Sequence, residues 1–393
     1  MRRTLLVPIV GAAILVGGCS SSSSSSSSSA SAPSASGAQT RTVKVDNSTS
    51  QFVGGFLAYF PNQVTVHPGD TVDFTETFSG EPHSVTLGTL VEKGLAAAKT
   101  ADPNGPPPAD LAALPTMLPQ GPGDADQRAV NPCFVDSGAI PSDGTAKCAT
   151  TTQPAFTGTQ AYYNSGFLNK GSHFAVKLAA DVAPGTYHYY CNLHGPDMSG
   201  TITVAPASTP IPAQSDVDAA GKAQLDAIVT KLAPAAQAAS TGQANLPGAA
   251  ANLAGFGSQA VTNAQIEQFY PATISAKVGE KVSWTFIGVH TITFGAATPP
   301  PFVITQAPDG AYHLDPHAAA PVPPPSGAPP ASSGSAPTTV DGGTYSGTGL
   351  HSSGIHQSFP PALVTYDLTF SKAGTYNYVC LIHPGMIGQV VVK

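Results

Sequence analysis

The strongest constraint on the fold is a strand pattern that occurs twice in the sequence. The segments from Pro61 to Phe74 and from Pro271 to Trp284 align without a gap. In both, apolar residues alternate with polar ones on either side of a Gly-Asp or Gly-Glu turn. This alternation is typical of two half-buried β-strands joined by a tight turn. The chain therefore contains two related strand-rich units, and we predict an all-β fold.

A second repeated pattern, Gly-Thr-Tyr-x-Tyr-x-Cys, lies near the end of each unit. It runs from Gly185 to Cys191 in the first unit and from Gly374 to Cys380 in the second, and a short apolar segment follows each copy. The glycine marks a turn, and the alternating residues after it predict a strand that ends at the cysteine. Short strands separated by turns favour a Greek-key β-sandwich or barrel in each unit.

Much of the remaining chain is rich in residues that interrupt regular structure. The sequence of 393 residues contains 40 Gly and 38 Pro, and only 10% of its residues are charged. Such segments bury too little apolar surface to form a packed core of their own. We therefore expect β domains at 41–206 and 263–393, a linker at 207–262, and long surface loops inserted at 88–164 and 295–353.

Two helices are expected outside the strand patterns. In the linker, apolar residues from Val217 to Leu232 recur at helical spacing, which predicts an amphipathic helix that ends before Pro234. We expect this helix to pack on a β domain and assign it no function. A shorter helix is expected near residues 90–99, where the first insertion begins.

The first residues of the chain have the pattern of an export signal. Arg2 and Arg3 precede an apolar run from Leu5 to Val16, which is too short to span a bilayer as a mature helix. Two glycines, Cys19 and an unbroken run of serines follow. This arrangement resembles the lipobox of bacterial lipoproteins, in which two acyl chains on the cysteine anchor the protein stably. The alternative is an ordinary cleaved signal peptide with an incidental cysteine.

The lipobox resemblance implies where the protein is found. It predicts a signal peptide at 1–19, lipidation of Cys19, a serine-rich tether at 20–40 and an extracytoplasmic protein that is lipid-anchored to the bacterial cell membrane. The formal net charge is -7, and the only adjacent basic pair is at the N-terminus, which argues against nucleic-acid binding.

The other four cysteines fall into two classes. Cys133 and Cys148 lie in one segment rich in Pro, Gly and Asp, so a local disulfide is their natural pairing in an oxidising compartment. Cys191 and Cys380 remain, each at the end of a predicted strand. They can bridge each other, or each can serve as a metal thiolate.

Each unit offers the same four metal-binding side chains: two histidines, a cysteine and a methionine. They are His83, Cys191, His194 and Met198 in the first unit, and His290, Cys380, His383 and Met386 in the second. A thiolate and two imidazoles in a trigonal plane, with a weak axial thioether, form a blue copper site that suits both Cu(I) and Cu(II). Structural zinc sites are normally built from Cys and His without Met. The repeated set therefore predicts two copper sites. A disulfide between Cys191 and Cys380 would leave the matching histidines and methionines unexplained.

The strand and the ligand loop resemble those of the cupredoxins, especially the plastocyanin and amicyanin group. The loop that begins at Cys380 has the short amicyanin-like spacing, and the loop that begins at Cys191 is one residue longer. The resemblance implies two tandem Greek-key cupredoxin β-sandwiches, each with a type 1 copper site. It assigns two equatorial histidines, a thiolate and an axial methionine to each set. It also implies that the second histidines, His194 and His383, are partly exposed in an apolar patch where electrons enter and leave.

These features favour a copper-binding electron-transfer protein that exchanges electrons with redox partner proteins. Copper storage or delivery in the cell envelope is the alternative, because the same ligands would serve it. A multicopper oxidase or a nitrite reductase-like enzyme is a weaker alternative. In those enzymes a histidine adjoins the ligand cysteine, whereas here the neighbours are Tyr190, Asn192, Val379 and Leu381. We therefore expect no catalysis and no small-molecule substrate.

Four further histidines lie in or near the second insertion. His313 with His317, and His351 with His356, have the spacing to chelate a further ion. We expect them instead to stay solvated in surface loops.

Overall fold

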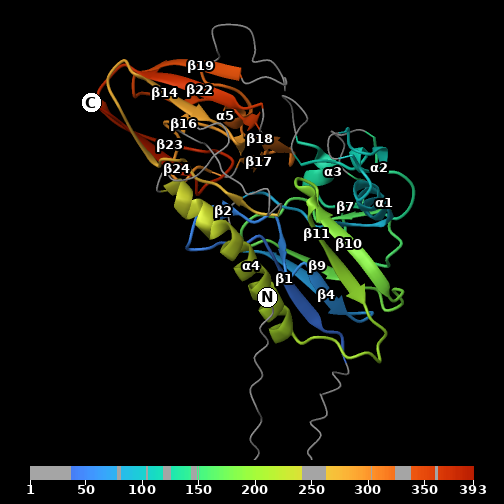
Figure 1. The fold of residues 1–393 in the computed structure, drawn as a ribbon. Coiled ribbons are helices and arrows are strands. Elements are labelled where there is room, and N and C mark those ends of the chain that lie inside the picture. The colour runs from blue at the N-terminus through green and yellow to red at the C-terminus, as the bar shows by residue number, and fades with distance from the viewer. Residues whose placement is uncertain are drawn as a thin grey trace, which may run out of the picture. The chain divides into compact units, whose positions relative to one another are not determined.

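The computed structural model describes residues 37–77, 81–102, 105–117, 125–142, 148, 150–240, 263–301, 303–323, 338–358 and 362–393. Cys19 and the predicted signal peptide lie outside these residues, as do most of the tether and the later part of the linker. Most of the regular structure in the described residues is β-strand, which confirms the all-β prediction (Figure 1). No helix in the described segments is long and apolar enough to span a membrane.

The first group of strands forms two sheets that pack face to face. One sheet has the order β3-β1-β5-β9: Tyr59–Phe60, Thr40–Val45, Thr71–Glu76 and His173–Lys177. The other has the order β4-β11-β10-β6-β8-β7: Gln63–Val66, Gly195–Val204, Gly185–Cys191, Thr86–Leu87, Tyr162–Asn164 and Cys133–Val135.

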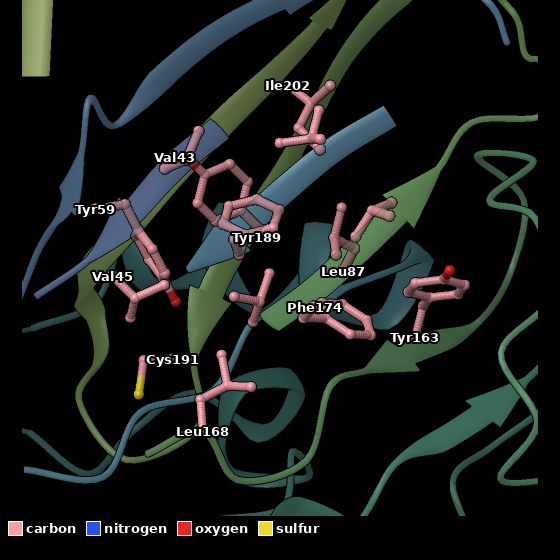
Figure 2. Packing of buried hydrophobic residues seen from close by; sticks show 14 of the residues in the cluster. Val43, Val45, Tyr59, Leu87, Tyr163, Leu168, Phe174, Tyr189, Cys191 and Ile202 are labelled. Atoms are coloured by element: carbon pink, nitrogen blue, oxygen red, sulfur yellow. The ribbon is translucent and has the colours of Figure 1, made fainter. Parts of the chain in front are cut away.

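Residues from both of these sheets meet in one buried cluster. Val43 and Tyr59 from the first sheet pack with Tyr189 and Ile202 from the second, and the Tyr59 and Tyr189 rings meet edge to face with centroids 4.8 Å apart. Figure 2 shows Cys191 at one end of this cluster. The alternating apolar residues of the strands thus form the core of a β-sandwich, and its end holds the cysteine.

The second group of strands repeats this arrangement. Its larger sheet has the order β13-β24-β23-β16-β20: Thr273–Ala276, Ile387–Val392, Gly374–Val379, Thr293–Phe294 and His351–Ser352. Its smaller sheet has the order β14-β22-β19: Lys281–Thr285, Val364–Phe370 and Thr338–Tyr345. The two sheets meet around Trp284, which is fully buried. Two further two-stranded sheets belong to this half: β15-β21 (Gly288–His290 and His356–Ser358) and the hairpin β17-β18 (Ile304–Gln306 and Tyr312–Leu314).

The inserted segments contain more regular structure than the composition predicts. The expected short helix is confirmed as α1 (Thr89–Ala98), and α2 (Ala109–Ala112), α3 (Gln127–Val130) and α5 (Pro316–Ala319) are additional. Strands β7 and β8 extend one sheet of the first sandwich, and β19 and β20 extend the sheets of the second. Most described residues of both insertions still lie outside helices and strands, in agreement with the predicted loops. Backbone pairing with an existing sheet edge stabilises these short strands, and their own sequence carries little apolar alternation.

Helix α4 (Gln214–Ser240) continues past Pro234, so the prediction that the helix ends there was wrong. The residues after the proline still have a buried face, because Ala236 packs in the same apolar cluster as Leu232. Tertiary packing of this face outweighs the cost of a proline inside the helix.

This apolar cluster joins the two halves of the chain. Helix α4, drawn in yellow in Figure 1, contributes Leu232, the first half contributes Phe56 and the second contributes Ile266. Beside the cluster, β2 (Gly54–Gly55) and β12 (Gln265–Ile266) form a two-stranded antiparallel sheet. A strand from each half thus completes one small sheet.

Candidate metal centres

The first candidate centre lies where strand β6 begins and strand β10 ends. His83 lies three residues before β6, Cys191 closes β10, and His194 lies in the turn that leads to β11. One donor atom from each of these three residues lies within 4.8 Å of the others. The Nδ1 atom of His83 is 4.0 Å from Cys191 Sγ. Strand pairing thus brings together residues that are far apart in the sequence.

The second candidate centre has the same construction. His290 closes β15, Cys380 follows β23, and His383 lies in the turn after it. The Nδ1 atoms of His290 and His383 are 3.0 Å apart, and His383 Nδ1 is 3.5 Å from Cys380 Sγ. All three side chains are buried.

Both cysteine sulfurs are held by equivalent backbone hydrogen bonds. The backbone N–H of Ser84 donates to Cys191 Sγ, and that of Thr291 donates to Cys380 Sγ, each over 3.4 Å. The hydroxyl oxygen of the same Ser84 or Thr291 accepts a hydrogen bond of 2.8 Å from the residue after the cysteine. The residue after the first histidine therefore fixes the ligand loop in both centres.

The two predicted axial methionines are fully buried. Met198 belongs to the same apolar cluster as Cys191, and Met386 to the same cluster as Cys380. The backbone N–H of Cys380 also donates to the carbonyl of Met386 over 3.0 Å. The two histidines and the cysteine of each predicted set therefore lie together, and the methionine is buried in the same apolar cluster as the cysteine.

The chemistry of these donors fits a soft metal ion. Burial opposes ionisation of Cys191, but the charges of His194 and His83 outweigh it and hold the thiol pKa well below its usual range. The pKa of Cys380 is lowered in the same way, mainly through His383. The Nδ1 atom of His194 is buried and has no hydrogen-bond partner within the described part of the chain. An unpaired buried nitrogen beside a thiolate is what a metal ligand requires.

All four histidines have an acceptor at their outer nitrogen. His83 Nε2 lies 3.2 Å from Asp46 Oδ2, and His290 Nε2 lies 2.9 Å from the carbonyl oxygen of Ile287. His194 Nε2 lies 2.5 Å from Glu81 Oε2, and His383 Nε2 lies 2.8 Å from Glu81 Oε1. Histidines that bind metal through one nitrogen usually donate the other N–H to such an acceptor, which fixes the ring and its tautomer.

Glu81 and a second carboxylate, Glu267, form a buried pair beside His383. Glu267 Oε1 lies 3.2 Å from His383 Nε2. Burial opposes ionisation of Glu81, but the charges of His194 and His383 hold its pKa well below the usual range. Burial and the neighbouring Glu81 charge raise the pKa of Glu267 well above it. Glu81 is thus the more acidic carboxylate of the pair.

The second histidines do not lie at an exposed patch, contrary to the implication of the cupredoxin resemblance. The His194 side chain is 12% exposed and that of His383 is 4% exposed. Their outer nitrogens face the buried carboxylate of Glu81 instead of solvent.

Three carboxylates around the centres were missed in the sequence: Asp46, Glu81 and Glu267. Asp46 directly follows strand β1 and lies far in the sequence from every ligand motif. Its backbone has a positive φ of 55°. An aspartate tolerates this conformation, and its Oδ1 accepts hydrogen bonds from the backbone N–H groups of Asn47 and Phe56. Glu81 alone carried a signal, because it stands two residues before His83.

The remaining predicted residues are placed as follows. A disulfide joins Cys133 and Cys148 beside the first sandwich. His351 and His356 lie in strands β20 and β21 and are buried, so the expectation that they stay solvated was wrong. The side chain of His317 is half exposed and lies beside Asp315. Strand pairing removes His351 and His356 from solvent, which their loop-like sequence context did not indicate.

Comparison with known proteins gives only distant matches. No protein-family model and no curated protein matches the chain. Among solved structures, the chain is similar to reduced auracyanin from the photosynthetic bacterium Roseiflexus castenholzii, with 19% identity and a TM-score of 0.23, over 43% of this chain and 99% of that one. It is similar to a purple cupredoxin from Nitrosopumilus maritimus, with 18% identity and a TM-score of 0.19, over 42% and 99% of the two chains. An oxidized amicyanin mutant matches with 20% identity and a TM-score of 0.16, over 32% and 73%. The function of the chain is therefore argued from the residues of the two centres.

Proposed function

We propose that this protein binds copper at two type 1 sites and transfers electrons. The observation that carries the proposal is the repeated donor set: two imidazole Nδ1 groups, a thiolate with a lowered pKa and a buried methionine, all in a β-sandwich. When bound, copper supplies a one-electron couple, and a thiolate with two imidazoles suits both of its oxidation states.

In this proposal the protein holds the ligands rigid. The sulfurs are held by the backbone of Ser84 and Thr291, and each imidazole is oriented by an outer acceptor. Ligands that are fixed before the metal binds rearrange little when its charge changes, and a small rearrangement favours fast electron exchange.

We further propose that the protein is not an enzyme and that its partners are redox proteins outside the cytoplasm. The absence of a histidine next to Cys191 or Cys380 in the sequence supports this. The lipobox-like sequence at Cys19 supports a lipid anchor on the bacterial membrane.

An optical and redox titration tests the function. Copper-loaded protein is expected to be intensely blue or green through thiolate-to-Cu(II) charge transfer, with two copper ions per chain. Cys191→Ser and Cys380→Ser should each remove one site and its share of the absorption, whereas the exposed His173→Gln should remove neither. A colourless protein that holds only Cu(I) and yields it to a chelator would overturn electron transfer in favour of copper handling. Oxygen or nitrite consumption with a reductant would overturn the non-enzymatic assignment.

A further inference from the structure

We infer that Glu81 couples the two metal centres into one electron-transferring unit, by joining the outer nitrogens of their second histidines through a single carboxylate. This inference rests on the proposed function. It goes beyond that function because two independent sites would need no connection.

The carboxylate of Glu81 uses a different oxygen for each centre. Oε2 lies 2.5 Å from His194 Nε2, and Oε1 lies 2.8 Å from His383 Nε2. Glu81 is 6% exposed, so little water reaches the contacts. From one Nδ1 to the other, the connection consists only of an imidazole ring, a carboxylate and a second imidazole ring.

This geometry also fixes both rings. A carboxylate accepts but does not donate, so Nε2 of His194 and of His383 must carry the hydrogen. The Nδ1 atoms of the two rings are then free to bind metal beside Cys191 and Cys380. One side chain thus selects the metal-binding tautomer in both centres.

Glu267 holds the bridging carboxylate in place. It hydrogen-bonds to Glu81, and its backbone N–H donates to the carbonyl of Val53 over 2.9 Å, beside the small sheet that joins the two halves. Gly55 leaves the necessary space, because a Cβ there would lie 2.5 Å from Glu267 Oε1. The bridge is therefore supported by the same segment that joins the halves of the chain.

The distances favour a hydrogen-bonded bridge over a third metal ion. Glu81, Glu267 and His383 have donors close enough to be considered as a metal-binding group. However, Glu81 Oε1 lies 2.8 Å from His383 Nε2, the length of a charge-assisted hydrogen bond, while Glu267 Oε1 lies 3.2 Å from the same nitrogen. Two ligands on one tetrahedral ion would be about 3.3 Å apart, given a metal–nitrogen distance of about 2.0 Å.

Electron transfer across this bridge would need no reactant besides the two centres. One electron leaves the reduced centre and enters the oxidised centre, so one centre is oxidised and the other is reduced by the same amount. The hydrogens on the two Nε2 atoms stay in place, and no further oxidant or reductant is consumed.

The first test is nitrogen-15 NMR of the histidine side chains in the full-length protein, with Cu(I) and without metal. We expect a pair of low-field Nε2–H resonances from His194 and His383 that exchange slowly with solvent, besides that of His83, whose Nε2 faces Asp46. Glu81→Gln should lose one of them, because an amide has only one acceptor oxygen. The matched control is Glu92→Gln, whose carboxylate binds the surface residue His188 over 2.8 Å. It should keep both resonances.

The second test measures intramolecular electron transfer by pulse radiolysis. A Met198→Gln background separates the absorption bands of the two centres, so that each can be followed. Adding Glu81→Gln should slow the transfer about ten- to hundredfold, the range in which loss of an outer partner of a metal ligand reduces metal affinity or activity. Adding Glu92→Gln should leave the rate unchanged.

Three outcomes would overturn the inference. They are the absence of both resonances in the wild-type protein, equal transfer rates with and without Glu81→Gln, and a third tightly bound metal ion per chain. The first of these does not require Glu81→Gln to fold. A protein without blue or green colour would contradict the proposed function instead, and the NMR spectrum of the metal-free chain would still test the contacts of Glu81.

Discussion

The two candidate centres share their inner donors but differ in the groups behind them. The first histidine of one centre faces the carboxylate of Asp46, whereas that of the other faces the carbonyl oxygen of Ile287. An anionic acceptor makes the imidazole a stronger electron donor, which stabilises the oxidised metal more than a neutral acceptor does. The first centre should therefore have the lower reduction potential, and electrons should pass from it to the second.

The position two residues before the first histidine differs as well. It is Glu81 in one half of the chain and Gly288 in the other. Gly288 has a φ of 106°, and a Cβ there would lie 2.7 Å from His290 Nε2. A glutamate at this position of the second half would be excluded. The bridging carboxylate can come from the first half only.

The largest effect is expected when the contact that joins the two halves is weakened. Leu232→Ala removes a fully buried side chain of α4 from the shared apolar cluster. The expected loss of unfolding free energy is about 2–5 kcal/mol, from lost burial and the cavity left behind. Chemical denaturation measures it, and Lys222→Ala on the exposed face of the same helix is the control. A change below about 1 kcal/mol would show that the cluster does not stabilise the two halves.

Acid should weaken the second half through His356. Burial lowers its pKa from 6.5 to about 4, and its Nε2 has no hydrogen-bond partner within the described segments. The unfolded chain therefore binds a proton between these pH values that the folded chain does not, so stability falls as the pH drops from 6.5 towards 4. The loss approaches about 3 kcal/mol.

The difference between wild type and His356→Leu isolates this contribution, because burial also lowers the pKa of His351 and its effect has the same sign. Denaturation at several pH values should give a flatter pH profile for His356→Leu. Exposed His173→Leu should keep the wild-type profile. An unchanged slope in His356→Leu would contradict the assignment.

Gly55→Ala should disturb the bridge without touching a metal ligand. The new methyl group would collide with Glu267, so the expected cost is about 1–3 kcal/mol in stability. The low-field resonance of His383 should broaden or shift more than that of His194, since Glu267 lies beside His383. Gly69→Ala is a control at a turn where a Cβ meets no other atom, although its positive φ adds some strain. Equal changes in both resonances would argue against a local effect.

Asp46→Asn should reduce the difference between the two centres. Loss of the negative charge behind His83 should raise the potential of the first centre by about 60 mV, which corresponds to about 1.4 kcal/mol for one electron. Spectroelectrochemistry measures both potentials, and that of the second centre should stay within error. A fall in the potential of the first centre would contradict the effect assigned to the Asp46 charge.

The inner donors could be predicted from the sequence because each cysteine, second histidine and methionine lie within one short loop. The repeated strand before each loop, and the alternation around Val64 and Ile274, also indicated the β-sandwich core. These patterns are local, and local spacing is what a sequence displays directly.

The outer acceptors could not be predicted because their contacts form between residues far apart in the sequence. Asp46 reaches His83, and Glu267 reaches His383, only after distant strands have paired. Glu81 is close to His83 in sequence but binds His194 and His383 instead. Nothing in the spacing of these residues indicates which histidine each will face. The continuation of α4 beyond Pro234 was missed for a similar reason, since its stabilising surface comes from other segments.

The placement of Glu81 in one half of the chain limits how far that half can act alone. If the chain were cut between α4 and β12, the first fragment would keep a carboxylate with one imidazole, and the second would keep His383 without its bridging acceptor. Strand β2 would also lose its only pairing partner among the described strands. The halves resemble each other in their strands and inner donors, yet they are not interchangeable modules, and neither would be expected to reproduce half of the whole protein's behaviour.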